Sequence, residues 1–134
     1  MAFAMRVMFA ALTLTDAMAC SDGPLELANL QIGRSLNQDR SVGSITTLFK
    51  PNETVYVAVQ TKAAGKGTIS VKWKFGGQVI DEPSKTVSFD GPGSTEFHLQ
   101  NSGGFPPGDY SVDVFIDGQP VGTRAFKVGG SPTG

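Results

Sequence analysis

The sequence predicts an all-β protein, an antiparallel β-sandwich of about seven strands without a disulfide. Over most of the chain beyond residue 24, apolar residues alternate with polar ones, which is typical of strands with one buried face. Seventeen glycines and eight prolines separate these alternations singly or in short clusters. The single cysteine leaves no pair to form a disulfide.

The expected strands follow this alternation. Val55, Val57 and Val59 give the clearest case, within residues 53–61. No window after the N-terminal segment carries an apolar stripe of helical period. The other expected strands lie at residues 25–32, 41–49, 68–75, 78–81, 87–89, 95–100, 109–116 and 121–128, the second of these being the least regular.

Turn-forming residues separate these strands. Asp117-Gly118 predicts a type I′ hairpin turn, because both central residues of that turn need positive φ. Gly76-Gly77 links two further alternations. Pro106-Pro107-Gly108 closes a loop before Tyr110. Many short strands at this spacing favour a sandwich over an α/β fold.

Two aromatic residues refine the prediction. Trp73 lies in the middle of a strand, where immunoglobulin-like sandwiches bury a tryptophan. Tyr110 opens a late strand, where such domains form a tyrosine corner, with the hydroxyl bonded to the backbone upstream. Both residues are therefore expected to be structural.

Four segments carry a more particular resemblance, at residues 49–57, 71–75, 107–114 and 126–128. They resemble a group of small exported bacterial immunoglobulin-like proteins of uncharacterised function, over about residues 32–128. The resemblance implies an immunoglobulin-like sandwich. It supplies no catalytic residues, because the shared positions are turn and core positions.

The N-terminal segment has the layout of a bacterial export signal. Arg6 precedes nine apolar residues, and Ala17-Met18-Ala19 precedes Cys20, the expected site of lipid attachment. Nine apolar residues are too few to cross a bilayer, which needs about 20. The predicted organisation is therefore a signal peptide at 1–19, a short tether at 20–24, the sandwich at 25–128 and a flexible tail at 129–134.

Other interpretations of this segment stay open. Ala17-Met18-Ala19 also fits an ordinary secretory cleavage site, which would release a periplasmic or secreted protein beginning at Cys20. A third interpretation leaves the segment uncleaved. If the protein is acylated, Ser21 after the cysteine favours the outer membrane or cell surface.

Charge and chemistry exclude several classes of function. Without Arg6 and Asp16 the chain keeps 10 basic and 11 acidic residues, without a block of one sign, so nucleic acid is a poor partner. His98, the only histidine, is expected on a strand surface, where no second histidine or cysteine can join it as a metal ligand. The acidic residues Asp81, Glu82, Asp90, Asp109, Asp113 and Asp117 mostly occupy turns. The sequence predicts no enzyme, no metal and no cofactor.

Three aromatic residues are candidates for partner contacts. Tyr56 and Phe115 fall at outward positions of their strands, and Phe105 lies in a loop beside two prolines. The alternative is that loops cover the strand residues and that Phe105 closes one end of the core. The expected function is a non-enzymatic binding or structural module, a lipid-anchored accessory subunit that binds another envelope or surface protein. The alternative is a carbohydrate-binding module that holds a glycan on exposed aromatics.

Overall fold

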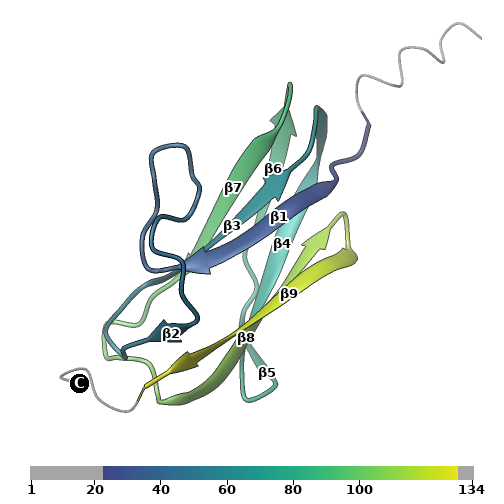
Figure 1. Cartoon of the computed structure of the whole chain (residues 1–134). Helices are drawn as coiled ribbons and strands as arrows, with labels where there is room; N and C mark the ends of the chain where they lie inside the picture. The colour runs from purple at the N-terminus through teal and green to yellow at the C-terminus, as the bar shows by residue number, and fades with distance from the viewer. Residues whose placement is uncertain (1–22, 130–134) are drawn as a thin grey trace, which may run out of the picture.

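The computed structural model describes residues 23–129, and all of the regular structure there is β-strand (Figure 1). Cys20, the predicted signal peptide and residues 130–134 lie outside the described residues. No helix within the described range is long and apolar enough to cross a membrane. The strands are β1 (Leu27–Gly33), β2 (Leu48–Phe49), β3 (Val55–Thr61), β4 (Gly65–Phe75), β5 (Gln78–Asp81), β6 (Ser84–Phe89), β7 (Gly93–Leu99), β8 (Gly108–Ile116) and β9 (Gln119–Val128).

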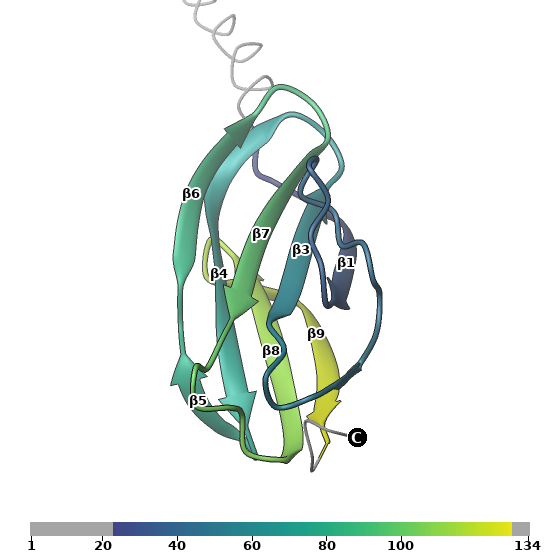
Figure 2. The same cartoon turned by 90° about the vertical axis from the view of Figure 1, so that its left-hand side faces the viewer.

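The strands form two facing sheets, which confirms the predicted sandwich (Figure 2). One sheet has the order β1-β3-β7. The other has the order β2-β9-β8-β4-β5, with β6 paired to the first half of β4. With the short strands β2 and β5 the sandwich has nine strands in the described range, against the seven or so predicted. The strand pairs are antiparallel, as predicted, except for β2 with β9, which is parallel.

The parallel pair arises because the chain changes sheets between β1 and β2. Residues 34–47 leave β1, run over the outer face of the first sheet and return as β2. A bridge between Leu36 and Val42 makes this segment a small hairpin, and Gln31 of β1 accepts a hydrogen bond from the Val42 backbone. The hairpin lies over the sheet, and Ala58 of β3 is buried although it points outward. The strand expected at 41–49 therefore shrinks to β2.

The core lies between the two sheets and is built from the alternating apolar residues. Trp73, in the last part of β4, is 0% exposed, and its ring meets Phe126 edge-on with centroids 6.1 Å apart. Tyr110 stacks between Phe126 and Phe75 at 5.3 and 4.5 Å. The prediction that Trp73 and Tyr110 belong to the core is confirmed.

The turns take the backbone geometry that their residues predict. Asp117 and Gly118 have φ of 50° and 83°, as a type I′ turn requires. Gly108, with φ of 146°, opens β8 where a Cβ would lie 2.9 Å from the ring of Phe75. Only glycine fits there, both for its φ and for the close approach of the aromatic ring.

Candidate functional site

The two outward-facing candidate aromatics lie on opposite faces of the sandwich. Tyr56 is half-buried on the outer face of the β1-β3-β7 sheet, where it pairs with His98 of β7. Phe115 is half-buried on the outer face of the other sheet, with the Lys72 ammonium 5.2 Å from its ring centroid. They therefore cannot form one coplanar strip for a sugar to stack on.

Phe105 is not exposed, so it is not available as an aromatic contact in this conformation. Its side chain is 5% exposed and meets Tyr110 edge-on at 5.9 Å. Its backbone N–H donates to Pro51 O at 2.8 Å, which fixes the loop over the end of the core. The residue closes one end of the sandwich, as the alternative interpretation predicted.

A polar cluster of His98, Glu96 and Lys85 begins beside Tyr56. The rings of Tyr56 and His98 lie 5.7 Å apart, and His98 Nδ1 lies 2.5 Å from Glu96 Oε2. Burial raises the pKa of Glu96, but the hydrogen bond from His98 and the charge of Lys85 outweigh it, so the net pKa is lowered. Among residues 23–129, no three histidine, cysteine or acidic side chains gather as metal ligands.

Lys85 joins the two sheets at their open side, where β6 and β7 run beside each other (Figure 2). Lys85 of β6 pairs with Ile69 of β4, which is fully buried, so the base of the Lys85 side chain points to the core-facing side of the sheet. Its ammonium then reaches across to the Glu96 backbone oxygen at 2.5 Å and carboxylate at 3.4 Å. An inward cation on an edge strand discourages pairing with another chain.

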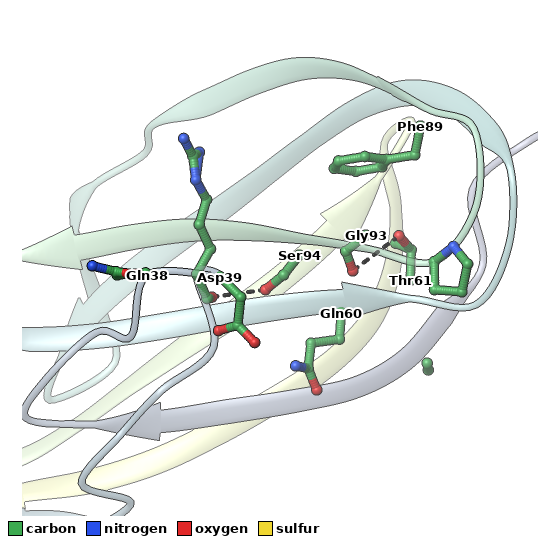
Figure 3. Close-up of a pocket in the computed structure, with 10 residues that line it drawn as sticks. Gln38, Asp39, Gln60, Thr61, Phe89, Gly93 and Ser94 are labelled. Carbon is green, nitrogen blue, oxygen red and sulfur yellow. Dashed lines mark hydrogen bonds between the residues drawn. The ribbon is translucent and has the colours of Figure 1, made fainter.

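A hollow of about 670 Å³ opens beside the hairpin of residues 34–47 (Figure 3). Gln60 of β3 and Ser94 of β7 line it from the sheet, Asp39 and Arg40 line it from the hairpin, and Phe89 lines it from the end of β6. The Ser94 hydroxyl donates to Arg40 O at 2.7 Å and fixes the hairpin to β7. The hollow combines an acid, a base, an amide and an aromatic ring, a set that can hold a small polar ligand.

The hairpin tip is held in a strained form. Arg40 has φ of 70°, an uncommon value for a residue other than glycine. Hydrogen bonds from the Ser41 hydroxyl and backbone N–H lower the pKa of Asp39, which keeps the carboxylate charged. The guanidinium of Arg40 has no ion pair among the described residues. The hairpin therefore holds a fixed carboxylate at the hollow, next in sequence to an arginine without an ion pair in the described part of the chain.

Four large apolar side chains are exposed in the described part of the chain, toward one end of the sandwich but not as one patch, because β2 and β5 are opposite edges of the larger sheet. Val79 and Ile80 on β5 are 43% and 48% exposed, and Ile45 and Leu48 beside the end of β1 are 64% and 61% exposed. β5 pairs with the last residues of β4, whereas Pro24 bridges to Lys66 near its start. The apolar side chains thus lie at the end opposite the N-terminal side of the described chain (Figure 1).

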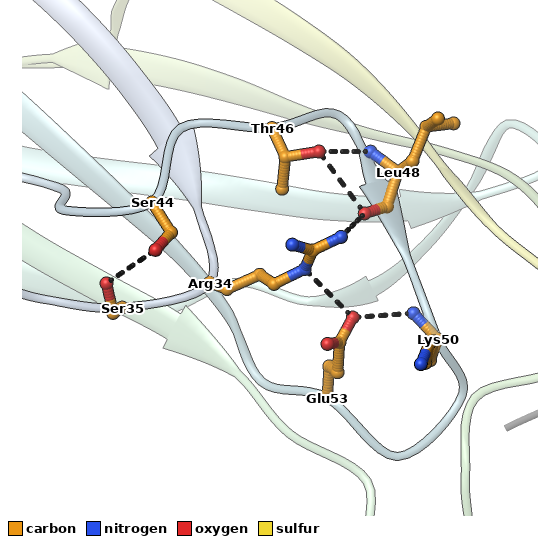
Figure 4. A network of polar contacts seen from close by, with 7 residues as sticks. All are labelled: Arg34, Ser35, Ser44, Thr46, Leu48, Lys50 and Glu53. Carbon is orange, nitrogen blue, oxygen red and sulfur yellow. Dashed lines mark hydrogen bonds and ion pairs between the residues drawn. The ribbon is translucent and has the colours of Figure 1, made fainter. Parts of the chain in front are cut away.

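Polar contacts hold Leu48 in place (Figure 4). Arg34 donates to Leu48 O and to Glu53 Oε1, both at 3.2 Å. Glu53 Oε1 also accepts from the Lys50 backbone at 2.7 Å. This network ties the end of β1 to β2 and to the turn before β3, so β2 stands as a fixed short strand with an apolar side chain facing out.

The sequence analysis missed Lys85, Asp39 and Arg40. The inward position of Lys85 could have been predicted, because Lys85, Val87 and Phe89 are alternate residues and therefore lie on the same, core-facing side of β6. No pattern pointed to the hairpin, since its position over the sheet is set by tertiary contacts. Cys20 lies outside the described residues, but Gly23 and Pro24 are already attached to β4, through Lys66 N donating to Gly23 O at 3.2 Å.

Comparison with known proteins defines the fold class. No protein-family model and no curated protein matches the sequence. An immunoglobulin-like protein from Pseudomonas aeruginosa superposes with a TM-score of 0.58 at 13% identity, over 81% of this chain and 99% of that one. The protein thus has an immunoglobulin-like β-sandwich.

Larger proteins contain a similar unit. The alkylpurine DNA glycosylase of Pseudomonas fluorescens matches with a TM-score of 0.53 at 13% identity, over 87% of this chain and 33% of the glycosylase. A cycloisomaltooligosaccharide glucanotransferase from Paenibacillus matches with a TM-score of 0.52 at 17% identity, over 82% of this chain and 14% of the enzyme. At these identities the likeness shows the fold alone.

Proposed function

We propose that this protein is a non-enzymatic binding module, exported and anchored by a lipid at Cys20, that serves as an accessory subunit of a cell-envelope assembly. The N-terminal layout from Arg6 to Cys20 supports export and acylation. The immunoglobulin-like neighbour, matched over its whole length, supports a binding or structural module.

The anchor would hold the sandwich close to its membrane. Gly23 and Pro24 are attached to β4, so only residues 20–22 separate the lipid from the folded domain. Three residues span at most about 10 Å of chain. The end that carries Pro24 would therefore face the membrane, and the opposite end would face outward.

The position of the exposed apolar side chains is the observation that carries this proposal. Ile45, Leu48, Val79 and Ile80 all lie at the end away from the anchor. Although β2 and β5 stand at opposite edges of their sheet, exposed apolar side chains at the same end offer contacts to another protein. A membrane-held module that presents this end outward would meet an envelope partner there.

The anchor is tested by expressing the whole chain in a bacterial host. Wild-type protein should partition into the detergent phase and carry a lipid on its mature N-terminus by intact mass. Cys20→Ala should stay aqueous, whereas Ser21→Ala should still partition with detergent. Wild-type protein without a lipid would refute the anchor.

The outward-facing end is tested with a photo-crosslinking residue placed at single positions. Position 48 or 80 should give an adduct with an envelope protein in intact cells. Position 62, in the turn near the membrane end, is the matched control and should give none. Equal adducts from position 62 would contradict the proposed orientation.

A sugar-binding role is the second candidate, and the hollow beside Asp39 and Arg40 favours it. Its carboxylate, guanidinium and amide groups suit hydroxyl-rich ligands, and Phe89 offers an aromatic edge. Glycan-array binding that is lost in Asp39→Asn and Gln60→Ala would support it. Binding unchanged in both variants would place any sugar elsewhere.

A further inference from the structure

Strand β9 has an edge that the structure leaves partly unpaired. β9 pairs with β8 along its length, but it pairs with β2 only at Lys127 and Val128. In the described part of the chain, no other strand pairs with that side of β9. Pro120, which has no backbone N–H, stands near its start. The unpaired stretch therefore runs over residues 121–125.

The backbone groups that face this edge can be identified. The Lys127 N–H donates to Thr47 O at 2.8 Å, so Lys127 points its backbone toward the β2 side. Alternate residues of a strand point the same way, which places the N–H and C=O of Ala125 and Thr123 on the same side. Where β2 no longer pairs with β9, these backbone groups are available to form hydrogen bonds with another strand.

The side chain of Arg124 places a positive charge at this edge of β9. Arg124 pairs with Val112, which is fully buried, so it lies on the core-facing side of β9, and yet it is exposed. Its guanidinium donates to Thr123 O at 3.0 Å. Within residues 23–129 no carboxylate lies within ion-pair distance of it. Lys85, in the corresponding position on β6, has Glu96 as its partner.

Apolar side chains lie beside Arg124. A Cβ at Gly122 would lie 3.2 Å from Leu30 Cδ2 and 3.6 Å from Leu27 Cδ2, so both leucines of β1 lie against the β9 backbone. A strand added to β9 would turn alternate side chains toward these leucines. Apolar residues at those positions would be buried, and an acidic residue among them would reach Arg124.

We propose that the β9 edge at residues 121–125 binds an extended segment of the partner protein, in line with β2. The segment carries one acidic residue, which pairs with Arg124, between two apolar residues that pack near Leu27 and Leu30. The proposal rests on the proposed binding function but does not require the lipid anchor. A second copy of the chain fits less well, because two β9 edges would bring two copies of Arg124 together.

The test uses the full-length chain purified in detergent and four capped heptapeptides. The first has the sequence Thr-Val-Thr-Glu-Thr-Val-Thr, in which alternation places valine and glutamate on one side. Two others replace glutamate with glutamine or lysine. The fourth keeps glutamate and carries N-methyl groups on the amides that would pair with β9. Binding is measured by NMR shifts of backbone amides and by titration.

The glutamate peptide should shift the amides of Thr123 and Ala125, and glutamine should weaken its binding about fivefold. The N-methylated peptide should not bind. In Arg124→Glu the preference should reverse, so that the lysine peptide binds best. Lys66→Glu makes the same charge change two strands away and should leave the order of the peptides as in the wild type.

Three results would overturn the inference. They are the absence of any shift at millimolar peptide, an unchanged peptide preference in Arg124→Glu, and protection of the β9 amides by self-association without peptide. Each would leave the proposed envelope function standing through another surface. Loss of the crosslinks at positions 48 and 80, with peptide binding intact, would instead count against the proposed orientation alone.

Discussion

The Tyr110 hydroxyl donates a hydrogen bond to the Pro106 carbonyl oxygen at 2.6 Å. The ring of Tyr110 is buried among Phe75, Phe105 and Phe126, while its hydroxyl reaches back four residues along its own chain. This is the tyrosine corner that the sequence predicts, and it holds the Pro106-Pro107 loop against the end of the core.

The first prediction concerns that bond. Tyr110→Phe keeps the ring and leaves the Pro106 carbonyl without its partner, so the free energy of unfolding should fall by about 1–3 kcal/mol. Urea denaturation of both proteins measures the change. Partner binding should persist wherever the variant is folded. Unchanged stability with lost binding would instead make Tyr110 a recognition residue and the adjacent loop the binding site.

The second prediction concerns Trp73. Trp73→Ala should cost about 3–5 kcal/mol, as large-to-small changes in a core do. Trp73→Phe should cost less, because it also removes a buried N–H that has no hydrogen-bond partner in the described part of the chain. Trp73 is the only tryptophan, so the fluorescence of the protein reports directly whether this side chain is buried. Native emission typical of indole in water would contradict its burial.

The third prediction concerns the inward cation on β6. Lys85→Ile removes the charge that faces β7 and should promote association through the β6 and β7 edges. Stability should change by less than about 1 kcal/mol, because the Lys85 side chain is 44% exposed and His98 still contacts Glu96. Sedimentation velocity over a concentration series measures association. Lys66→Ile, on the outer face of β4, is the control, and equal association of both variants would exclude a role for the edge.

The fourth prediction is a pH dependence at Glu96. Its pKa is lowered in the folded state from an ordinary value of 4.5, so the charged form stabilises the fold. That contribution is present above about pH 4.5 and is lost as the pH falls through the lowered pKa. Glu96→Gln should therefore be less stable than wild type at pH 7, with the difference vanishing in acid. Thermal unfolding from pH 2 to 8 measures it.

The control for that titration is Glu82→Gln, because Glu82 is exposed and has no ion pair among the described residues. Its unfolding curve should follow that of wild type at every pH. If the stability difference between Glu96→Gln and wild type grew as the pH fell, the pKa of Glu96 would be raised in the folded state instead of lowered. That result would contradict the role of the His98 and Lys85 contacts.

Local pattern was sufficient to predict most of the sandwich. Alternation identified the long strands because each one has a single buried face, and positive φ at Asp117-Gly118 followed from turn chemistry. Trp73 and Tyr110 were predicted correctly because their strand parity placed them inside. The parallel β2–β9 pair was missed, since two residues are too few to show a period.

The candidate surfaces were harder to predict because they depend on contacts between distant segments. Phe105 has no strand parity, so the sequence could not tell a loop aromatic that contacts a partner from one that closes the core. Ala58 has outward parity and is nevertheless buried, because the hairpin of residues 34–47 covers its sheet. Arg124 lies at an unpaired edge because β2 ends before it reaches that part of β9. A sequence pattern gives the ends of strands less reliably than their presence, so this edge could not be predicted.

The two ends of the described chain lie at opposite ends of the sandwich (Figure 1). A pull that separates residue 23 from residue 129 would act along the strands. β2 and β9 point the same way, and Thr47 and Phe49 accept the hydrogen bonds that join them, from Lys127 and Gly129. Such a pull would shear these bonds together instead of unzipping them one by one. A domain held at one end and loaded at the other thus gains mechanical resistance from its shortest strand.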